Sequence, residues 1–290
     1  MYVVKGMIYH SFAIVRSEDN MKKHLSTILP IFVFTLGLSL LFYPTVSNLW
    51  NIRHQSRAVK NYSLVMDEKD QQEKQAAIDE AVVYNESLLS NTSRFIPTEE
   101  ELNVYKDLLN ADGTGMMGYI TIPSIDCKLA IYHTVDSSVL QVGVGHLEGS
   151  SLPVGGKSTH TVLSGHRGLP SAKLFTDLYQ LKEGDLFYLH IYDKVLMYEV
   201  DQIAIVEPND YGLLQIEEGK DLCTLFTCTP YGINTHRLLV RGHRVENTNT
   251  DVHLISEASK ISPTLVAACI GVLILVIICI VYTVIIKRLK

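Results

Sequence analysis

Residues 224–242 read Thr-Leu-Phe-Thr-Cys-Thr-Pro-Tyr-Gly-Ile-Asn-Thr-His-Arg-Leu-Leu-Val-Arg-Gly. Two runs rich in Thr, Leu and Val flank a loop that contains Pro, Gly and Asn, a pattern typical of two strands joined by a turn. Cys228 ends the first run and Arg237 begins the second. In an antiparallel pair the end of one strand lies beside the start of the next, so we expect these two residues to be neighbours.

A thiol attacks only as a thiolate, so a catalytic cysteine needs a group that stabilises the anion. A histidine within hydrogen-bond reach can do this and later protonate a leaving amine, and an arginine offers N–H donors to a developing oxyanion. His166, in the turn 164–168 after a predicted strand, is the candidate partner of Cys228. Four other histidines compete with it: His146, His160, His236 and His243. An isolated cysteine at a strand end is also often only a small buried hydrophobic residue.

Short predicted strands separated by turns continue through the region from Met117 onward. They are rich in Val, Ile, Leu, Tyr and Thr, and Gly, Pro, Asp and Asn lie between them. Strands of this number and length suggest a closed barrel or a sandwich. The predicted strands are 118–122, 127–132, 161–164, 186–192, 196–206, 222–227 and 237–245, with a short helix over 174–181.

The region before the strands has helical character. Between residues 51 and 89, Ile78, Val82 and Leu89 follow helical spacing, which indicates either amphipathic helices or a solvated spacer. Pro97 ends any preceding helix, and residues 98–101 resemble the capped start of another.

Two segments are long and apolar enough to cross a bilayer. No charged residue occurs in 25–50 or in 261–286, and about 20 helical residues suffice to span the hydrocarbon core. Lysines precede the first segment, and Lys287, Arg288 and Lys290 follow the second, so the positive-inside rule places both ends in the cytoplasm. A cleaved signal peptide remains an alternative for the first segment, although no clear small-x-small site follows it. Met21 is a more natural start than Met1 for an anchored protein.

The bulk composition excludes some functions. A net charge of −6 argues against a nucleic-acid partner. Cys127, Cys223 and Cys228 are the three cysteines outside the apolar segments, so at least one of them is unpaired within the chain. Side chains five residues apart point to opposite faces of a strand, which disfavours a bond between Cys223 and Cys228. No Cys or His pair has the spacing of zinc ligands, and we expect no metal or other cofactor.

Several motifs together resemble one family. TLFTC at 224–228 matches the TLxTC signature of sortases, and the similarity continues through TPYGINTHRLLVRG to Gly242. SGHRGLPSAKLF at 164–175, GYITIP at 118–123 and GVGHLEGSSLPVGG at 143–156 agree with it. The chain is similar to class C sortases, the pilus-assembling transpeptidases of Gram-positive bacteria, over roughly residues 84–244.

The resemblance implies a mainly β fold, a closed sortase β-barrel with short helices, an N-terminal helical or lid region and two flanking transmembrane helices. The expected segments are a cytoplasmic N-terminus (1–24), an anchor (25–46), an extracytoplasmic helical linker with a candidate lid (47–116), the catalytic barrel (117–246), a tether (247–262), a transmembrane helix (263–286) and a cytoplasmic tail (287–290).

The resemblance also implies an activity. Cys228 would attack the Thr–Gly carbonyl of an LPxTG-like sorting signal, and a pilin lysine would then resolve the thioacyl enzyme into an isopeptide bond. His166 would act as general acid and then base, and Arg237 would hold the carbonyl or the oxyanion, with Thr227 and Ser164 in support. The implied partners are pilin subunits that carry a sorting signal and an acceptor lysine, together with the membrane.

One feature of the family is missing. Many class C sortases carry a lid with an Asp-Pro-aromatic motif, and no Asp-Pro occurs between residues 51 and 118. Arg94 and Phe95 lie in about the right place, and Phe95 is the candidate to fill the cleft.

Three other functions stay open at this level. The first is a sortase that anchors proteins to cell-wall peptide amines. The second is a papain-like hydrolase, which would need an Asn or Asp to orient the histidine. The third is a non-enzymatic adhesin.

Overall fold

The computed structural model describes residues 2–246 and residue 271, with side chains from residue 29 onward. The chain divides into two compact units, Met1–Val46 with Ser262–Lys290, and Ser47–Ile261. The predicted tether (247–262), second membrane span (263–286) and tail (287–290) lie outside the described residues, apart from Gly271.

The first element is one long helix, α1 (Tyr2–Glu68), which contains Pro30 and Pro44. The predicted anchor at 25–46 lies within it. Among the described residues, Leu29–Glu68 is the one helix long and apolar enough to cross a membrane, by its length and composition. The helix begins at Tyr2, well before the predicted anchor, and continues beyond it to Glu68. Residues 7–29 contain no Gly or Pro, the two residues that most disfavour a helix.

Two shorter helices follow, α2 (Gln71–Leu88) and α3 (Glu99–Asp107). The Asp70 side chain caps α2 by accepting a hydrogen bond from the backbone N–H of Glu73 at 2.7 Å. At α3, Thr98 and Glu101 form the reciprocal capping box that the sequence predicted. The amphipathic helix is the correct alternative and the solvated spacer is wrong here, because the buried residues of α2 are spaced three and four apart: Ile78, Ala81, Asn85 and Leu88. The predicted apolar face is only partly right, since Ile78 is buried whereas Val82 and Leu89 are exposed.

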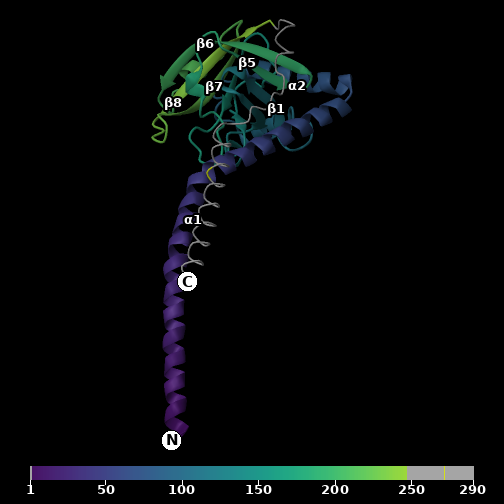
Figure 1. The fold of residues 1–290 in the computed structure, drawn as a ribbon. Helices are drawn as coiled ribbons and strands as arrows, with labels where there is room; N and C mark the ends of the chain where they lie inside the picture. Colours follow the sequence, from purple (N-terminus) through teal and green to yellow (C-terminus); the bar gives the residue numbers. More distant parts are fainter. Residues whose placement is uncertain (1, 247–270, 272–290) are drawn as a thin grey trace. The chain divides into compact units, whose positions relative to one another are not determined.

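Eight strands close into a barrel in the order β1-β2-β3-β4-β7-β8-β6-β5 (Figure 1). This arrangement confirms the barrel and rules out the sandwich. Pairs β2–β3 and β4–β7 are parallel, and the other pairs are antiparallel. The strands are β1 (Met116–Ile122), β2 (Cys127–His133), β3 (Val144–His146), β4 (Thr159–Ser164), β5 (Leu186–Ile191), β6 (Lys194–Val206), β7 (Asp221–Thr229) and β8 (His236–Val245).

The seven predicted strands are all present, and the structure differs from the sequence reading at two places. Strand β3 was missed because it has only three residues and includes Gly145, where a Cβ would lie 2.2 Å from the Thr134 carbonyl oxygen. The helix predicted over 174–181 is reduced to the 3-10 turn Leu178–Gln180, and Leu174 at its predicted start has a φ of +39°, outside the right-handed helical region. The remaining short helices are α4 (Ser137–Leu140), η1 (Pro123–Ile125), η2 (Leu178–Gln180) and η3 (Gly212–Leu214).

Strand alternation separates two apolar clusters. The barrel interior holds Cys223 and Leu225 of β7 together with large side chains such as Phe187 and Tyr198. Phe226 points the other way and packs against a separate cluster built on Val162, Leu214 and Leu239. Because successive side chains of a strand face opposite sides, this second cluster lies on the outside of the β4–β7–β8 sheet.

Two buried histidines should make the fold acid-sensitive. Burial lowers the pKa of both His146 and His160 to about 4. Both are neutral in the fold, so their contribution to stability is complete above about pH 6.5 and is lost as the pH falls toward 4. Each of the two histidines should therefore lower the free energy of unfolding by about 2 kcal/mol between pH 7 and pH 5. Denaturant unfolding of the chain in detergent at the two pH values measures this loss.

A matched pair of variants isolates this effect. His160→Gln keeps an N–H donor for the Gln215 carbonyl but removes the titrating ring, so it should reduce the loss of stability between pH 7 and pH 5. His54→Gln changes an exposed histidine of α1 and should leave that loss unchanged. Equal pH dependence in all three proteins would contradict the prediction.

Candidate active site

The predicted neighbours Cys228 and Arg237 are directly paired in the β7–β8 hairpin. Residues opposite one another in an antiparallel pair project their side chains to the same face, so the thiol and the guanidinium share the outer face of the barrel. Arg237 Nη1 donates to the carbonyls of Asn234 and His236, each at 3.1 Å. Its guanidinium carbon lies 6.0 Å from the ring centre of Phe226, two residues before the thiol.

His166 reaches the same end of the barrel through the parallel pairing of β4 with β7. The last pair of that ladder is Ser164 with Phe226. Beyond it, Gly165 N–H donates to the Phe226 carbonyl at 3.0 Å, and the Thr227 hydroxyl donates to the Gly165 carbonyl at 2.7 Å. The two segments therefore keep the register of the strands beyond the last pair. His166 lies two residues after Ser164, and Cys228 lies two residues after Phe226.

Close packing fixes the turn that carries His166. At Gly165 a Cβ would lie 2.6 Å from the Phe175 ring, so no larger residue fits. The backbone then folds back, and Phe175 N–H donates to the His166 carbonyl at 3.1 Å. The imidazole itself is only partly buried, and that burial lowers the pKa of His166 below its ordinary value.

The two predicted supporting residues, Thr227 and Ser164, lie on the neighbouring strands β7 and β4. Thr227 is buried on the inner face of β7 and links it to Gly165. Ser164 is the buried last residue of β4.

Sequence reasoning missed Arg167. Its Nη1 donates to the Thr229 hydroxyl at 3.0 Å, and its guanidinium carbon lies 4.9 Å from the ring centre of Tyr179. These contacts join the histidine turn to the residue after Cys228. The only available signal was its place directly after His166.

The competing histidines have other partners. In His146, buried deep in the fold, Nε2–H donates to the Ser151 carbonyl and Nδ1 accepts from the Tyr105 hydroxyl. His236 lies on the surface, 3.3 Å from a Glu207 oxygen. His160 and His243 belong to the polar network described below.

The three cysteines of the described region are all free. Burial raises the pKa of Cys127 to about 12 and that of Cys223 well above its ordinary value, so both thiols are poor nucleophiles. Cys228 is the one of the three on the outer face beside Arg237.

The predicted lid residue Phe95 packs against the outer apolar cluster that contains Phe226. Its ring stacks on Tyr211 at a centroid distance of 5.2 Å. Since Phe226 and Cys228 are two residues apart on one strand, this cluster adjoins the thiol on the same face.

Arg94 fastens that segment to the barrel. It is buried and donates to the Gly149 and Leu214 carbonyls, both at 3.0 Å, and to the Gln215 side-chain oxygen at 3.3 Å. Desolvation lowers its pKa, since no carboxylate offsets the burial. Gly149 makes the docking possible, because a Cβ there would lie 1.8 Å from the Arg94 carbonyl oxygen.

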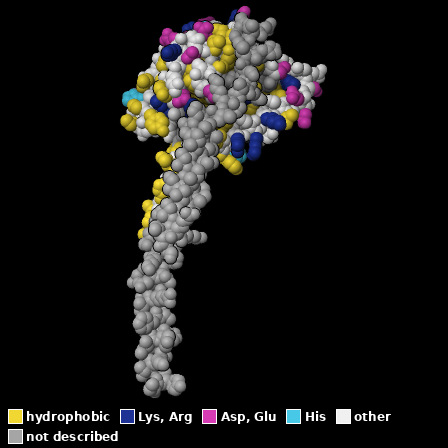
Figure 2. Space-filling model, in the orientation of Figure 1, with side chains coloured by type: hydrophobic (Ala, Val, Ile, Leu, Met, Phe, Trp, Pro, Cys, Tyr) yellow, Lys and Arg dark blue, Asp and Glu magenta, His cyan; other side chains and the backbone are white. Residues whose placement is uncertain are grey.

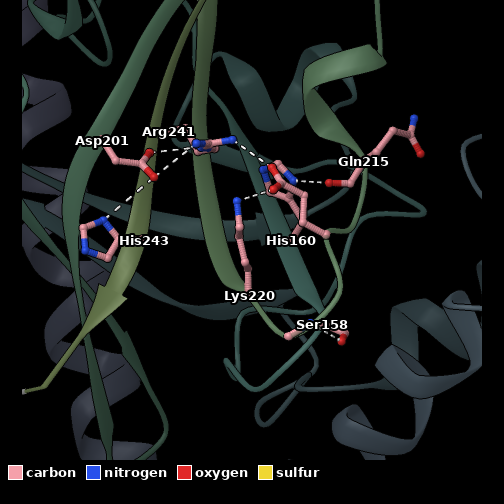
Figure 3. Close-up of polar contacts among 9 residues, drawn as sticks. Ser158, His160, Asp201, Gln215, Lys220, Arg241 and His243 are labelled. Carbon is pink, nitrogen blue, oxygen red and sulfur yellow. Dashed lines mark hydrogen bonds and ion pairs between the residues drawn. The ribbon is translucent and has the colours of Figure 1, made fainter.

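A polar network holds the β6–β7 connection against the same face (Figure 3). Arg241 pairs with both oxygens of Asp201 at 3.0 and 3.1 Å, and with Glu217 at 2.9 Å. His160 donates to the Gln215 carbonyl at 2.8 Å. Arg241 therefore positions the connection, and His243 lies 3.8 Å from the same aspartate.

Comparisons with known proteins agree with this geometry. A family model described as the sortase domain matches residues 120–245. The crystal structure of sortase C1 from Streptococcus agalactiae is 50% identical, covers 66% of this chain and 100% of that chain, and superposes with a TM-score of 0.65. Sortase C from Streptococcus pneumoniae is 44% identical, with 66% and 98% coverage and a TM-score of 0.60.

Curated relatives are more distant. Sortase A of Bacillus anthracis is 30% identical over 134 residues, which is 46% of this chain and 62% of that protein. Sortase D of Bacillus subtilis is 30% identical over 131 residues, 44% of this chain and 63% of that protein. The chain thus spans somewhat over three fifths of the length of these two relatives.

The link between Thr227 and Gly165 can be tested directly. Thr227→Val should lower the unfolding midpoint, because it leaves the Gly165 carbonyl without its hydroxyl donor, at a cost of about 1–3 kcal/mol. Thr235→Val, at an exposed position of the β7–β8 loop, serves as the control and should leave the midpoint unchanged. Equal midpoints for the two variants would contradict this role.

Proposed function

The chain belongs to the sortase family, and we propose that it is a class C enzyme that cleaves an LPxTG-like sorting signal and joins the product to a pilin lysine. The observation that carries the proposal is the register that sets Cys228 opposite Arg237 and in step with His166. Identity of 50% over the whole of a solved sortase C1 supports the class. A sortase C from Clostridium perfringens, solved with its C-terminal cell wall sorting motif, is 44% identical.

Acylation uses all three residues. The Cys228 thiolate attacks the Thr–Gly carbonyl carbon of the signal, and the oxyanion that forms accepts hydrogen bonds from the Arg237 guanidinium. The C–N bond then breaks, and the His166 imidazolium gives its proton to the departing glycine amine. The product is a thioester on Cys228.

Transfer reverses the proton movement. Neutral His166 takes a proton from the acceptor lysine amine as the amine attacks the thioester carbonyl. The C–S bond breaks, the thiolate is restored, and an isopeptide bond joins the two subunits. A cell-wall peptide amine or water could enter at the same step, which would make the enzyme an anchoring sortase or a hydrolase.

The proposed location is the cell membrane, with spans at 25–46 and 263–286, the catalytic barrel outside and both ends in the cytoplasm. The long apolar helix among the described residues supports the first span. Two spans favour pilus polymerisation over wall anchoring.

The segment around Arg94 and Phe95 is proposed as the lid. Its support is the packing of Phe95 on the cluster beside Cys228 and the anchoring of Arg94 by three oxygen acceptors. An aromatic side chain with a buried arginine would replace the missing Asp-Pro-aromatic motif.

The chemistry is tested with an LPxTG peptide. The chain should form an acyl adduct on Cys228, seen by mass spectrometry, and should transfer the acyl group to an added lysine-bearing pilin in preference to a wall-peptide amine or water. Cys228→Ala should abolish the adduct, whereas Cys127→Ala should retain it. Arg237→Ala should lower kcat/KM by about 10²–10³-fold. A Cys228→Ala chain that still forms the product would refute the mechanism.

The lowered pKa of His166 sets the pH profile. Thiols ordinarily lose their proton at higher pH than imidazoles, so the reactive form, with a thiolate and an imidazolium, becomes more populated as the pH rises until His166 deprotonates. Because burial lowers the pKa of His166 below its ordinary value of about 6.5, the rising limb of kcat/KM against pH should level off with an apparent pKa under 6.5. His166→Gln should remove this limb from the residual activity. The prediction fails if the limb lies at pH 7 or above in the wild-type chain.

The lid is tested by the rate of thiol labelling at Cys228. Phe95→Ala removes the packed ring, and Gly149→Ala displaces the Arg94 backbone, so both should speed labelling. Ile96→Ala is the matched control, because that neighbouring side chain is 83% exposed. Unchanged rates for both test variants would show that the segment does not cover the thiol.

A further inference from the structure

The second half of α1 exposes a basic face that the proposed chemistry does not use. Its members are spaced three and four residues apart, so they lie on one side of the helix. All five are exposed. This basic stripe consists of Trp50, Arg53, Arg57, Lys60 and Leu64.

The opposite side of the helix is fixed to the barrel. Gln55 Oε1 accepts from the Ala130 N–H at 2.8 Å, and the Tyr62 hydroxyl donates to the Met117 carbonyl at 2.8 Å. Val59, Tyr62 and Met66 form a buried cluster with barrel residues. The stripe therefore points away from the barrel and cannot turn inward without breaking these contacts.

No acidic residue lies within six residues of the stripe's three cations along α1, and the first ones, Asp67 and Glu68, end the helix. Residues 20–66 contain no Asp or Glu, although the whole chain carries a net charge of −6. Within the described part of the chain, none of its three cations forms an ion pair. Figure 2 shows Lys and Arg side chains gathered along the edge of the barrel unit where Figure 1 draws this half of α1.

The same helix indicates the partner. Its apolar run ends near Val46, and Arg53 follows seven residues later. Trp50, the only tryptophan of the chain, lies at this border, where tryptophan is enriched in membrane proteins. Cations on the outer flank of a span run against the positive-inside rule, so a compensating anionic surface is expected there.

Helix geometry requires that the stripe lie along the surface to use all its charges. Leu64 is 14 residues beyond Trp50, which is about 21 Å of helix. If α1 ran straight along the bilayer normal, Lys60 would lie beyond the roughly 10 Å range of surface charge. Pro44 has no N–H for the helical ladder, so the helix can bend just before the stripe.

We propose that residues 50–64 lie on an anionic phospholipid surface, with the barrel on the opposite side of the helix. This inference rests on the proposed membrane anchoring and is independent of the acyl-transfer chemistry. It holds the barrel about one helix diameter, near 10 Å, above the headgroups. Asn48 Oδ1 accepts from the Lys173 N–H at 2.8 Å, so the loop that follows His166 is tied to the same helix.

The test moves the single tryptophan to the distal end of the stripe. A Trp50→Phe, Leu64→Trp chain is reconstituted in nanodiscs of phosphatidylcholine with or without phosphatidylglycerol, with a nitroxide on a fraction of the headgroups. Nitroxide quenches only nearby tryptophan. In the anionic discs the fluorescence should fall about twofold or more, and less in the neutral discs.

Charge variants make the result specific. Adding Arg53→Gln, Arg57→Gln and Lys60→Gln should abolish the extra quenching in anionic discs, and peptide cleavage in detergent should be retained. The matched control changes three exposed lysines elsewhere and should keep the quenching: Lys106→Gln, Lys157→Gln and Lys182→Gln.

The possible failures are distinguishable. An inserted chain without quenching overturns the surface proposal and leaves the anchor and the enzyme intact. A chain that binds soluble polyanions but shows no quenching also overturns it, since the stripe would then serve another partner. A chain that does not insert overturns the anchoring as well.

Discussion

Strands β4 and β7 run side by side and parallel over six residue pairs, from Thr159 with Asp221 to Ser164 with Phe226. Parallel strands leave a sheet at the same end, so the residues that follow them meet there. The hydrogen bonds of Gly165 to Phe226 and Thr227 continue the register past the last pair. The ladder therefore brings the turn that carries His166 to the end of β7 that carries Cys228, and the proposed acyl transfer would depend on it.

The barrel divides its side chains between stability and chemistry. Inward residues of β7 such as Cys223 belong to the packed core, where burial keeps a thiol protonated. Outward residues of the same strand include Cys228, the proposed nucleophile, and Phe226, which packs against the outer apolar cluster. A change of one residue in register would exchange the two sets, so the buried core also determines which cysteine of β7 lies on the outer face beside Arg237.

Two arginines show how the fold uses cations away from carboxylates. Arg94 is surrounded by backbone and amide oxygens, an arrangement that holds a segment in place while the charge remains costly to bury. Arg237 is only partly buried, and two carbonyl acceptors orient its guanidinium through Nη1. The other N–H groups of the guanidinium can donate to a substrate. The same residue type thus has two uses: Arg94 anchors a segment to the barrel, and Arg237 is a candidate hydrogen-bond donor to the oxyanion.

The sequence by itself determined the local features. The Pro-Gly-Asn loop between two apolar runs predicted the Cys228–Arg237 neighbours, and the Thr98–Glu101 pair predicted the start of α3, because each depends on contacts within a few residues. Strand spacing likewise predicted seven of the eight strands. The family motifs pointed to His166, but the residues alone left five histidines in competition. The strand pattern left barrel and sandwich open, and the family motifs favoured the barrel that the structure confirms. Only the tertiary structure brought Phe95 to the cluster beside Cys228. It also decided which side of α1 faces outward. These outcomes depend on the register and packing of segments far apart in the sequence, such as Arg94 with Leu214, 120 residues away, and no local pattern encodes such a contact.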